Sequence, residues 1–269
     1  MVKIHFLNFF SVPKVKYFTL QLILLIIVTI IITTILGCSA MSTQNKKPRP
    51  SQTFYNHGNE NFNLGKYETA IQKYTKSITY NPKFVEAYSN RGLAYDKLEK
   101  YDLAIKDFNK ALKIDPKYSI AYNNRGTVFN KQKKYDLAIK DYSKALEIDP
   151  EYAEAYSNRG VSYDKLQKNE LAIVDYSQAI RLDSNYAIAY NNRGNIFIKQ
   201  KKYDMALLDL ENAIKIDSNY AIAYANRGIV YKHKKKYTLA IKDFSKFLAF
   251  NPDYAEIHNY IGEIYYEIK

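Results

Sequence analysis

The chain is poor in the residues that build metal centres and disulfides. Its 269 residues include one cysteine, four histidines and no tryptophan. A single cysteine forms neither an internal disulfide nor a thiolate cluster for zinc. The four histidines, which do not have the spacing of metal ligands, are His5, His57, His233 and His258. The sequence therefore predicts no metal site and no cofactor.

Glycine is also scarce, and its placement leaves none for nucleotide chemistry. Seven of the nine glycines recur at one fixed spacing, at Gly58, Gly92, Gly126, Gly160, Gly194, Gly228 and Gly262. The other two are Gly65, in a predicted turn, and Gly37, near the amino terminus. No glycine-rich loop remains to cradle phosphates, and the acidic residues follow the repeat rather than forming an isolated acid–base pair. We therefore expect a non-catalytic protein without a small-molecule substrate.

A repeating pattern fills the chain from residue 53 onwards. Its period is 34 residues, and one copy reads AYSNRGLAYDKLEKYDLAIKDFNKALKIDPKYSI. Five closely related copies begin at Ala87, Ala121, Ala155, Ala189 and Ala223. Each contains two runs of apolar residues at spacings of three and four, separated by a turn. Each copy therefore predicts a helix hairpin, which must stack on its neighbours to bury its apolar face.

The order of residues inside a copy resembles the tetratricopeptide repeat. The matching residues in the copy from Ala87 are Tyr88, Arg91, Gly92, Tyr95, Ala104, Phe108 and Pro116. The resemblance implies an all-α, right-handed superhelical solenoid that binds other proteins. It divides the chain into six repeats, at residues 53–86, 87–120, 121–154, 155–188, 189–222 and 223–256, and a capping helix at residues 257–269.

The capping helix is predicted from an apolar stripe. The stripe has helical spacing and consists of Ile257, Ile261, Ile264 and Ile268. The opposite face is polar, as the end of a solenoid requires. We therefore expect a helix with one face on the array and the other in water.

Arginine and aspartate recur together at a separation of 16 residues. The five pairs are Arg91 with Asp107, Arg125 with Asp141, Arg159 with Asp175, Arg193 with Asp209, and Arg227 with Asp243. The first copy has His57 and Lys73 at these positions, so it lacks both partners together. This joint loss predicts structural salt bridges within each copy. The alternative is a row of arginines that binds phosphate or carboxylate groups.

Asparagine stands two residues before the repeat glycine in all six copies. The row consists of Asn56, Asn90, Asn124, Asn158, Asn192 and Asn226. In similar superhelices the first helices line a concave groove. In the O-linked N-acetylglucosamine transferase family, such asparagines hold the backbone of an extended polypeptide, because an amide both donates and accepts hydrogen bonds. The resemblance thus implies a peptide groove, although duplication alone is the alternative origin of the row.

Lysines are expected to border the same groove and to favour acidic segments. They follow the repeat glycines by five residues and are Lys97, Lys131, Lys165 and Lys199. The whole chain has a formal net charge of +13. A nucleic acid is not expected, because the basic residues form no concentrated stripe and the amino terminus carries an export signal. An acidic peptide suits the charge better.

The amino terminus resembles a bacterial lipoprotein signal peptide. Three lysines precede a chargeless apolar run at residues 18–36, which ends in Ile35-Leu36-Gly37-Cys38. The resemblance implies cleavage before Cys38 and lipidation of that residue, with a polar tether at residues 39–52. The run is also long enough to remain as a transmembrane anchor, so this alternative stays open.

Both readings of the amino terminus place the repeats outside the cytoplasm by the positive-inside rule. A third alternative is a eukaryotic anchor with cytosolic repeats. The sequence thus predicts a membrane-tethered, protein-binding scaffold of the bacterial envelope. An adaptor that presents substrates to a separate enzyme is the alternative function, and an enzyme in its own right is the third.

Overall fold

The computed structural model describes residues 26–29, 31, 32 and 49–269, which fall into two units divided between Arg49 and Pro50. In the first unit, residues 26–29, 31 and 32 are helical, and all of the described residues are exposed. Among all described residues, no helix combines the length and the apolar character that a membrane crossing needs. Cys38 and most of the predicted signal sequence lie outside the described residues.

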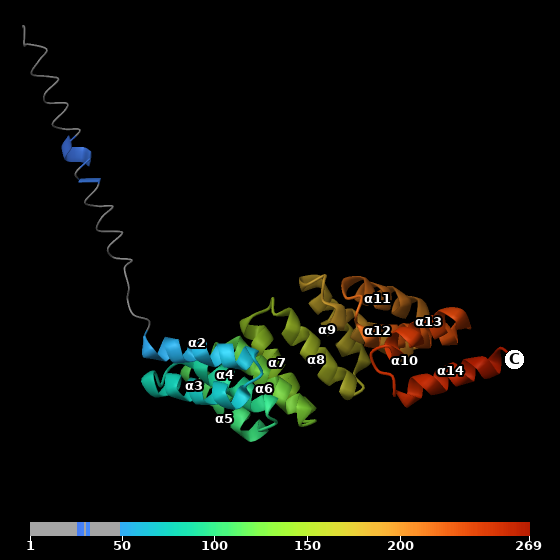
Figure 1. Ribbon diagram of the computed structural model, residues 1–269, viewed down its shortest axis with the longest axis horizontal. Helices are drawn as coiled ribbons and strands as arrows, with labels where there is room; N and C mark the ends of the chain where they lie inside the picture. Colours follow the sequence, from blue (N-terminus) through green and yellow to red (C-terminus); the bar gives the residue numbers. More distant parts are fainter. Residues whose placement is uncertain (1–25, 30, 33–48) are drawn as a thin grey trace, which may run out of the picture. The chain divides into compact units, whose positions relative to one another are not determined.

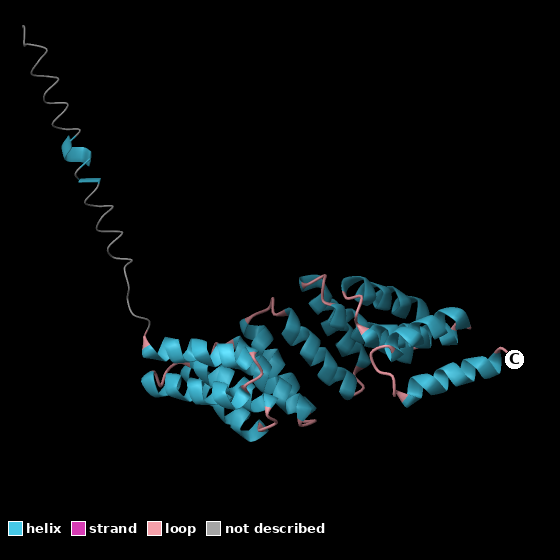
Figure 2. Ribbon diagram, in the orientation of Figure 1, coloured by secondary structure: helices cyan, strands magenta, loops and turns pink. Residues whose placement is uncertain are grey.

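The second unit is built entirely from helices (Figures 1 and 2). Between residues 50 and 269 these are α2 (Pro50–Asn63), α3 (Tyr67–Tyr80), α4 (Val85–Lys97), α5 (Tyr101–Ile114), α6 (Ser119–Lys131), α7 (Tyr135–Ile148), α8 (Ala153–Lys165), α9 (Asn169–Leu182), α10 (Ala187–Lys199), α11 (Tyr203–Ile216), α12 (Ala221–His233), α13 (Tyr237–Leu248) and α14 (Ala255–Glu267). Helices α2 to α13 pair into six hairpins, and α14 follows alone. Each second helix also packs on the first helix of the next hairpin. The predicted all-α solenoid is confirmed.

The hairpins begin slightly before the predicted repeat boundaries. From the second repeat on, each first helix starts two residues before the predicted start of its repeat. For example, α4 starts at Val85, and the predicted repeat starts at residue 87. Helix α2 starts at Pro50, so the last three residues of the predicted tether are helical. Proline suits a first helical position, because its fixed backbone angle is helical and the amide it lacks would have no partner there.

Hairpin turns use one left-handed residue. It is Gly65 in the first hairpin, with φ of 71°. The five later hairpins have side chains at this position, with φ between 55° and 59°, at Glu99, Lys133, Gln167, Lys201 and Lys235. Glycine adopts this conformation at no steric cost, so only the first hairpin has the residue that its turn favours.

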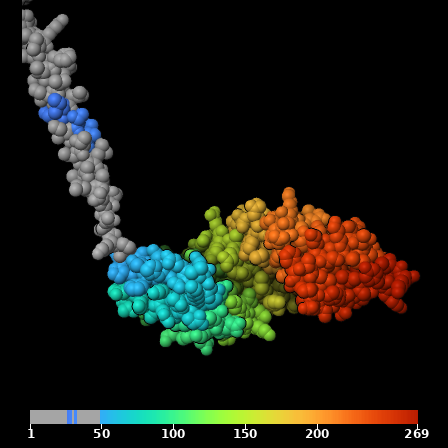
Figure 3. Space-filling model, viewed as in Figure 1, coloured from blue at the N-terminus to red at the C-terminus, as the bar shows by residue number. Residues whose placement is uncertain are grey.

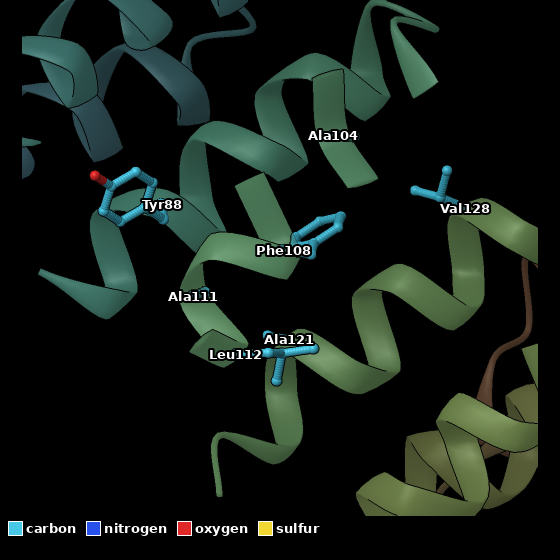
Figure 4. Close-up of a cluster of buried hydrophobic side chains, with 7 residues drawn as sticks. All are labelled: Tyr88, Ala104, Phe108, Ala111, Leu112, Ala121 and Val128. Carbon is cyan, nitrogen blue, oxygen red and sulfur yellow. The ribbon is translucent and has the colours of Figure 1, made fainter. Parts of the chain in front are cut away.

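Each hairpin closes where an apolar ring or leucine of the second helix lies on the repeat glycine of the first. A Cβ atom built on Gly92 would lie 2.8 Å from the Phe108 ring, and one built on Gly126 would lie 2.8 Å from the Tyr142 ring. Figure 4 shows Phe108 of α5 in the cluster that Ala121 and Val128 of α6 complete, all three fully buried. Packing therefore requires glycine at this position of the first helix. The ring that lies on the glycine also packs on the first helix of the next hairpin.

Helix α14 departs from the predicted cap. Ile257 and Ile264 are buried, as the stripe predicts, but Ile268 is 56% exposed. Ile268 follows the last helical residue, Glu267, at the end of α14 that lies near the start of α13. The expectation that the whole stripe is buried is therefore wrong.

Substituting Gly126 by alanine should destabilise the array. The new methyl group would overlap the ring of Tyr142, which is fully buried and has no room to move. Overpacking of this kind costs roughly 1–3 kcal/mol. The measurement is the urea unfolding curve. The matched control is Gly262→Ala in α14, where the new Cβ would meet no atom within 4 Å apart from the adjacent residues and the backbone of its own helix. There the gain in helix propensity should leave stability unchanged or raised by up to about 1 kcal/mol. Equal losses in both variants would contradict the packing role.

Candidate functional site

The structure brings all five predicted arginine–aspartate pairs together. Each arginine donates from Nε and Nη2 to the two carboxylate oxygens of its aspartate, at 2.7–2.9 Å. The pairs are Arg91–Asp107, Arg125–Asp141, Arg159–Asp175, Arg193–Asp209 and Arg227–Asp243. The aspartates are buried. A bidentate contact of this kind fixes both the distance and the orientation of the two helices.

Four of these arginines also reach the preceding repeat. Their Nη1 atoms donate to Thr75, Asn109, Ser143 and Ser177, each on the second helix of the previous hairpin. The guanidinium of Arg91 also lies 5.6 Å from the ring centroid of Tyr88. Burial lowers the pKa of Arg91, but the hydrogen bonds and charge of Asp107 outweigh this, and the pKa is raised. With their charge neutralised and their donors occupied, these arginines have little left for an external anion.

The asparagine row lies on the first helices, on a surface that we call the asparagine face: Asn56, Asn90, Asn124, Asn158, Asn192 and Asn226, on α2, α4, α6, α8, α10 and α12. Asn56 is exposed and accepts a hydrogen bond from Gln52. The other five are half-buried. A depression of about 320 Å³ opens beside Asn90, between Asn59, Phe62 and Leu93.

Three of these asparagines are tied to the previous repeat. Asn90 donates to Tyr55 and Asn59, at 3.0 and 2.9 Å. Asn158 donates to Asn123 at 3.1 Å. The equivalent pair lies two repeats further along the chain, where Asn226 donates to Asn191 at 2.9 Å. Their amide donors hold neighbouring repeats together.

The two remaining asparagines have different surroundings. The Nδ2 atom of Asn124 is buried, and no partner for it lies within residues 49–269. Asn192 accepts a hydrogen bond from Asn191. Neither asparagine makes the contact that Asn158 and Asn226 make with an asparagine of the preceding repeat. At the equivalent positions the preceding repeat has serine, which is Ser89 for Asn124 and Ser157 for Asn192. Serine is too short to make the contact that Asn123 and Asn191 make with the next repeat.

A lysine contact replaces the missing amide contact at the same junctions. Lys131 donates to both carboxylate oxygens of Asp96, at 2.8 and 2.6 Å, and so joins the second and third repeats. Lys199 donates to Asp164 at 2.7 Å and joins the fourth and fifth. Two of the four predicted groove lysines are therefore neutralised. Within residues 49–269, Lys97 and Lys165 form no ion pair, and both are exposed.

Sequence reasoning missed a row of tyrosines on this face. Each directly precedes a first helix, and the row is Tyr118, Tyr152, Tyr186 and Tyr220. Asn123 donates to the Tyr152 hydroxyl at 3.2 Å. Burial raises the pKa of all four, to about 12 for Tyr118, so they stay protonated at neutral pH. Their 34-residue spacing, which is the spacing of the glycines, was the signal that could have found them.

Exposed isoleucines lie beside the asparagines on three helices. Ile120, Ile188 and Ile222 are each four residues before an asparagine, so the two side chains share one helical face. Their exposed fractions are 43%, 47% and 52%. The equivalent residues of the second and fourth repeats are Glu86 and Glu154. The chemistry of the asparagine face therefore alternates from the second repeat to the fifth.

The structure was compared with the predicted absence of a metal site over the residues that it describes. There, no group of three or more histidine, cysteine, aspartate or glutamate side chains could hold a metal ion. The ring of His233 stacks on that of Tyr203, and His258 bonds to the backbone oxygen of Pro252.

Family comparisons agree with the repeat architecture. Models of the tetratricopeptide repeat match residues 85–118, 119–152, 187–220, 142–174 and 221–254, and a TPR repeat model matches residues 58–99 and 163–201. Together they cover residues 58–254. No curated protein matches the chain.

Solved structures share the fold at low identity. In the Cut9–Hcn1 hetero-tetramer of the APC/C, the similar chain is 21% identical with a TM-score of 0.74, and the match covers 81% of this chain and 44% of that one. The present chain thus spans less than half of that relative. Pseudomonas aeruginosa pilF is 18% identical with a TM-score of 0.72, over 80% of this chain and 97% of its own. YrrB, a TPR protein with an unusual peptide-binding site, is 24% identical with a TM-score of 0.55, over 69% and 96%.

Replacing Asp141 by alanine should destabilise the third repeat. Arg125 would keep its charge in a part-buried site without its carboxylate partner. Breaking such a pair from one side costs about 1–4 kcal/mol when some solvent remains. Hydrogen exchange of α6 and α7 would report the local loss. As a control, Lys144→Ala breaks the exposed Lys144–Glu147 pair on the same helix and should change little. An Asp141 variant with unchanged protection would contradict the structural role.

Proposed function

Because the chain belongs to the tetratricopeptide repeat family, whose members mediate protein–protein interactions, we propose that it is a scaffold that binds an extended polypeptide along the asparagine face. The observation that carries this proposal is the buried and unpartnered Nδ2 of Asn124. A buried donor without a partner is costly, and a backbone carbonyl of a bound polypeptide would satisfy it.

Asn124 and Asn192 are the two residues that contact the polypeptide backbone in this proposal. Each has an exposed isoleucine four residues earlier, Ile120 or Ile188, on the same face of its helix. An asparagine that bonds to backbone beside an apolar contact recognises an extended chain with little dependence on its sequence. The peptide-binding site named for YrrB, a similar fold, supports this class of ligand.

The charge of the proposed partner follows from the groove lysines. Lys97 and Lys165 are exposed and without a carboxylate partner in residues 49–269, whereas Lys131 and Lys199 are paired. Glu86 and Glu154 lie on the same helices. We therefore propose that Lys97 and Lys165 each favour an acidic residue of the bound polypeptide. The lysines do not form a continuous basic surface along the face. Generally, members of this family are non-catalytic, and a scaffold role needs no reacting group.

The tether remains part of the proposal and rests on the sequence alone. The basic residues, the apolar run and Cys38 resemble a lipoprotein signal, which would hold the repeats on the extracytoplasmic side of a membrane. Two acyl chains anchor a protein stably, whereas one does so only marginally. The scaffold would then gather its polypeptide partner at the membrane surface.

Removing the amides of Asn124 and Asn192 should weaken peptide binding. Peptides of 15 residues would be selected by phage display on the full chain and measured by fluorescence anisotropy. We expect Asn124→Ala with Asn192→Ala to lose one hydrogen bond each, about 2 kcal/mol in total and roughly 30-fold in affinity. The matched control is Asn158→Ala with Asn226→Ala, which should lower stability but leave affinity nearly unchanged. A control that weakens binding as much as the test variant would refute the assignment.

Mass spectrometry of the protein from native membranes tests the tether separately. The expected amino terminus is a diacylglycerol-modified and acylated Cys38, and Cys38→Ala should abolish the modification. An intact Met1 with unmodified Cys38 would show a retained anchor instead and would contradict lipidation. Neither result bears on the asparagine face, so the two parts of the proposal fail independently.

A further inference from the structure

The second helix of the second repeat carries a row of lysines on one face. Lys106, Lys110 and Lys113 of α5 follow one another at spacings of four and three residues, which places their side chains on the same side of the helix. All three are exposed. They line a depression of about 390 Å³, whose other lining residues are Tyr88, Arg91, Asp107 and Asn109. We call it the lysine depression.

The lysine depression is separate from the asparagine face. Its lysines belong to a second helix, whereas the asparagines belong to first helices. Helix α5 lies at the lower edge of the array in Figure 1, and Figure 3 shows the surface of the same edge. Occupancy of the depression therefore does not depend on a polypeptide bound to the asparagine face.

Within residues 49–269, no carboxylate pairs with the lysines of the depression, and none of the three donates a hydrogen bond. Asp107 is held through both carboxylate oxygens by Arg91, at 2.7 and 2.8 Å. Asp102, one turn before Lys106, forms no ion pair with it. Like charges four residues apart on a helix repel each other. An anion bound among these lysines would therefore relieve an unfavourable interaction.

An equivalent depression in the third repeat differs chiefly in its charge. Its volume is about 460 Å³, and each of its lining residues lies 34 positions after its counterpart in the second repeat. Glu147 stands in place of Lys113 and accepts a hydrogen bond at 2.7 Å from Lys144, the equivalent of Lys110. In the described chain, one charged substitution thus separates a depression with three unpaired lysines from a depression with one.

Duplication does not account for the three lysines. The fourth repeat shares the sequences SNRG and YDKL with the second, yet it has Val174, Gln178 and Arg181 at the three positions. Of the second helices α3, α5, α7, α9, α11 and α13, only α5 has lysine at all three. The row is therefore a property of this one repeat.

We propose that the lysine depression binds a phosphate monoester. An ammonium group is a compact point charge with three donors and suits a phosphate, whereas the guanidinium fork of arginine matches a planar carboxylate. The guanidinium that lines the depression, that of Arg91, is already occupied by Asp107. A phosphate monoester carries about −1.5 to −2 charge at pH 7, so it offsets more of the lysine charge than one carboxylate does.

Two sources present this group, a phospholipid and a soluble phosphate ester. A volume of about 390 Å³ lies near the lower end of the roughly 300–1,000 Å³ that small-molecule sites occupy. It accommodates the headgroup of a phosphatidic acid or a small ester of the same chemistry. The lipid would be available at the membrane to which the proposed tether attaches the chain, so this source rests on the tether and the soluble source does not.

Calorimetric titration of the full chain in an uncharged detergent tests the site. The lipid probe is dihexanoyl phosphatidic acid, the soluble probe is glycerol 3-phosphate, and succinate is the dicarboxylate control. At about 0.15 M salt, the Debye length of about 8 Å limits attraction to distant charges. We expect saturable binding of a phosphate probe at one site per chain and at least tenfold weaker binding of succinate. Binding of the lipid alone assigns the source to a headgroup, whereas equal binding of both probes shows that a soluble ester suffices.

Exchanging the charges of the two depressions gives the decisive variants. Lys113→Glu copies the third repeat, so the new carboxylate should pair with Lys110 and weaken binding at least tenfold. Glu147→Lys copies the second repeat and should raise the number of sites from one to two. Lys140→Glu is the matched control, because it makes the same charge change in the third repeat and should leave the affinity within about twofold. All three side chains are exposed, so thermal unfolding should change little.

Three outcomes would overturn the proposal. The first is no saturable binding of either phosphate probe up to about 10 mM, where any affinity is negligible. The second is an affinity for succinate equal to that for the phosphate probes. The third is equal weakening by Lys113→Glu and Lys140→Glu, which would indicate attraction to the net charge of the protein rather than a site.

Discussion

The contact between the repeat glycine and the side chain opposite it determines most of this structure. Because the glycine has no Cβ, the two helices of a hairpin approach until the ring of Phe108 or Tyr142 lies on the backbone of Gly92 or Gly126. That separation brings an arginine on the first helix within reach of an aspartate on the second. The same arginine then bonds to the preceding hairpin. Hairpin closure and stacking thus follow from one close approach, and the side chains of the first helices keep a constant orientation along the array.

The fold could be predicted because it depends on features that every copy repeats. Glycine, alanine and aromatic residues at one 34-residue period specify a hairpin, whatever the neighbours are. The arginine–aspartate pairs could also be predicted, since the first copy has His57 and Lys73 in their places and so reveals which residues depend on each other. Both inferences need only comparisons between equivalent positions.

The candidate site was harder, because it depends on contacts between copies that are not equivalent. All six asparagines look alike in the sequence, yet the length of a side chain on the previous helix decides whether each amide is occupied. Asn123 reaches Asn158, but Ser89 does not satisfy Asn124. A pattern within one helix contains no information about these neighbours.

Alternation between two kinds of junction explains how amides could become free without weakening the array. The third and fourth repeats are joined by Asn158 and Asn123, and the fifth and sixth by the equivalent amide contact. At the second-to-third and fourth-to-fifth junctions, lysine–aspartate pairs join the first helices instead. At the first of these junctions, the buried Nδ2 of Asn124 has no partner in residues 49–269, whereas Asn192 interacts with Asn191 and Tyr176. An ion pair has therefore taken over the structural task of the amide contact at both of these junctions. Duplication of a two-repeat unit would copy this exchange, so a single change of contacts in one ancestral unit is enough to create both lysine–aspartate junctions.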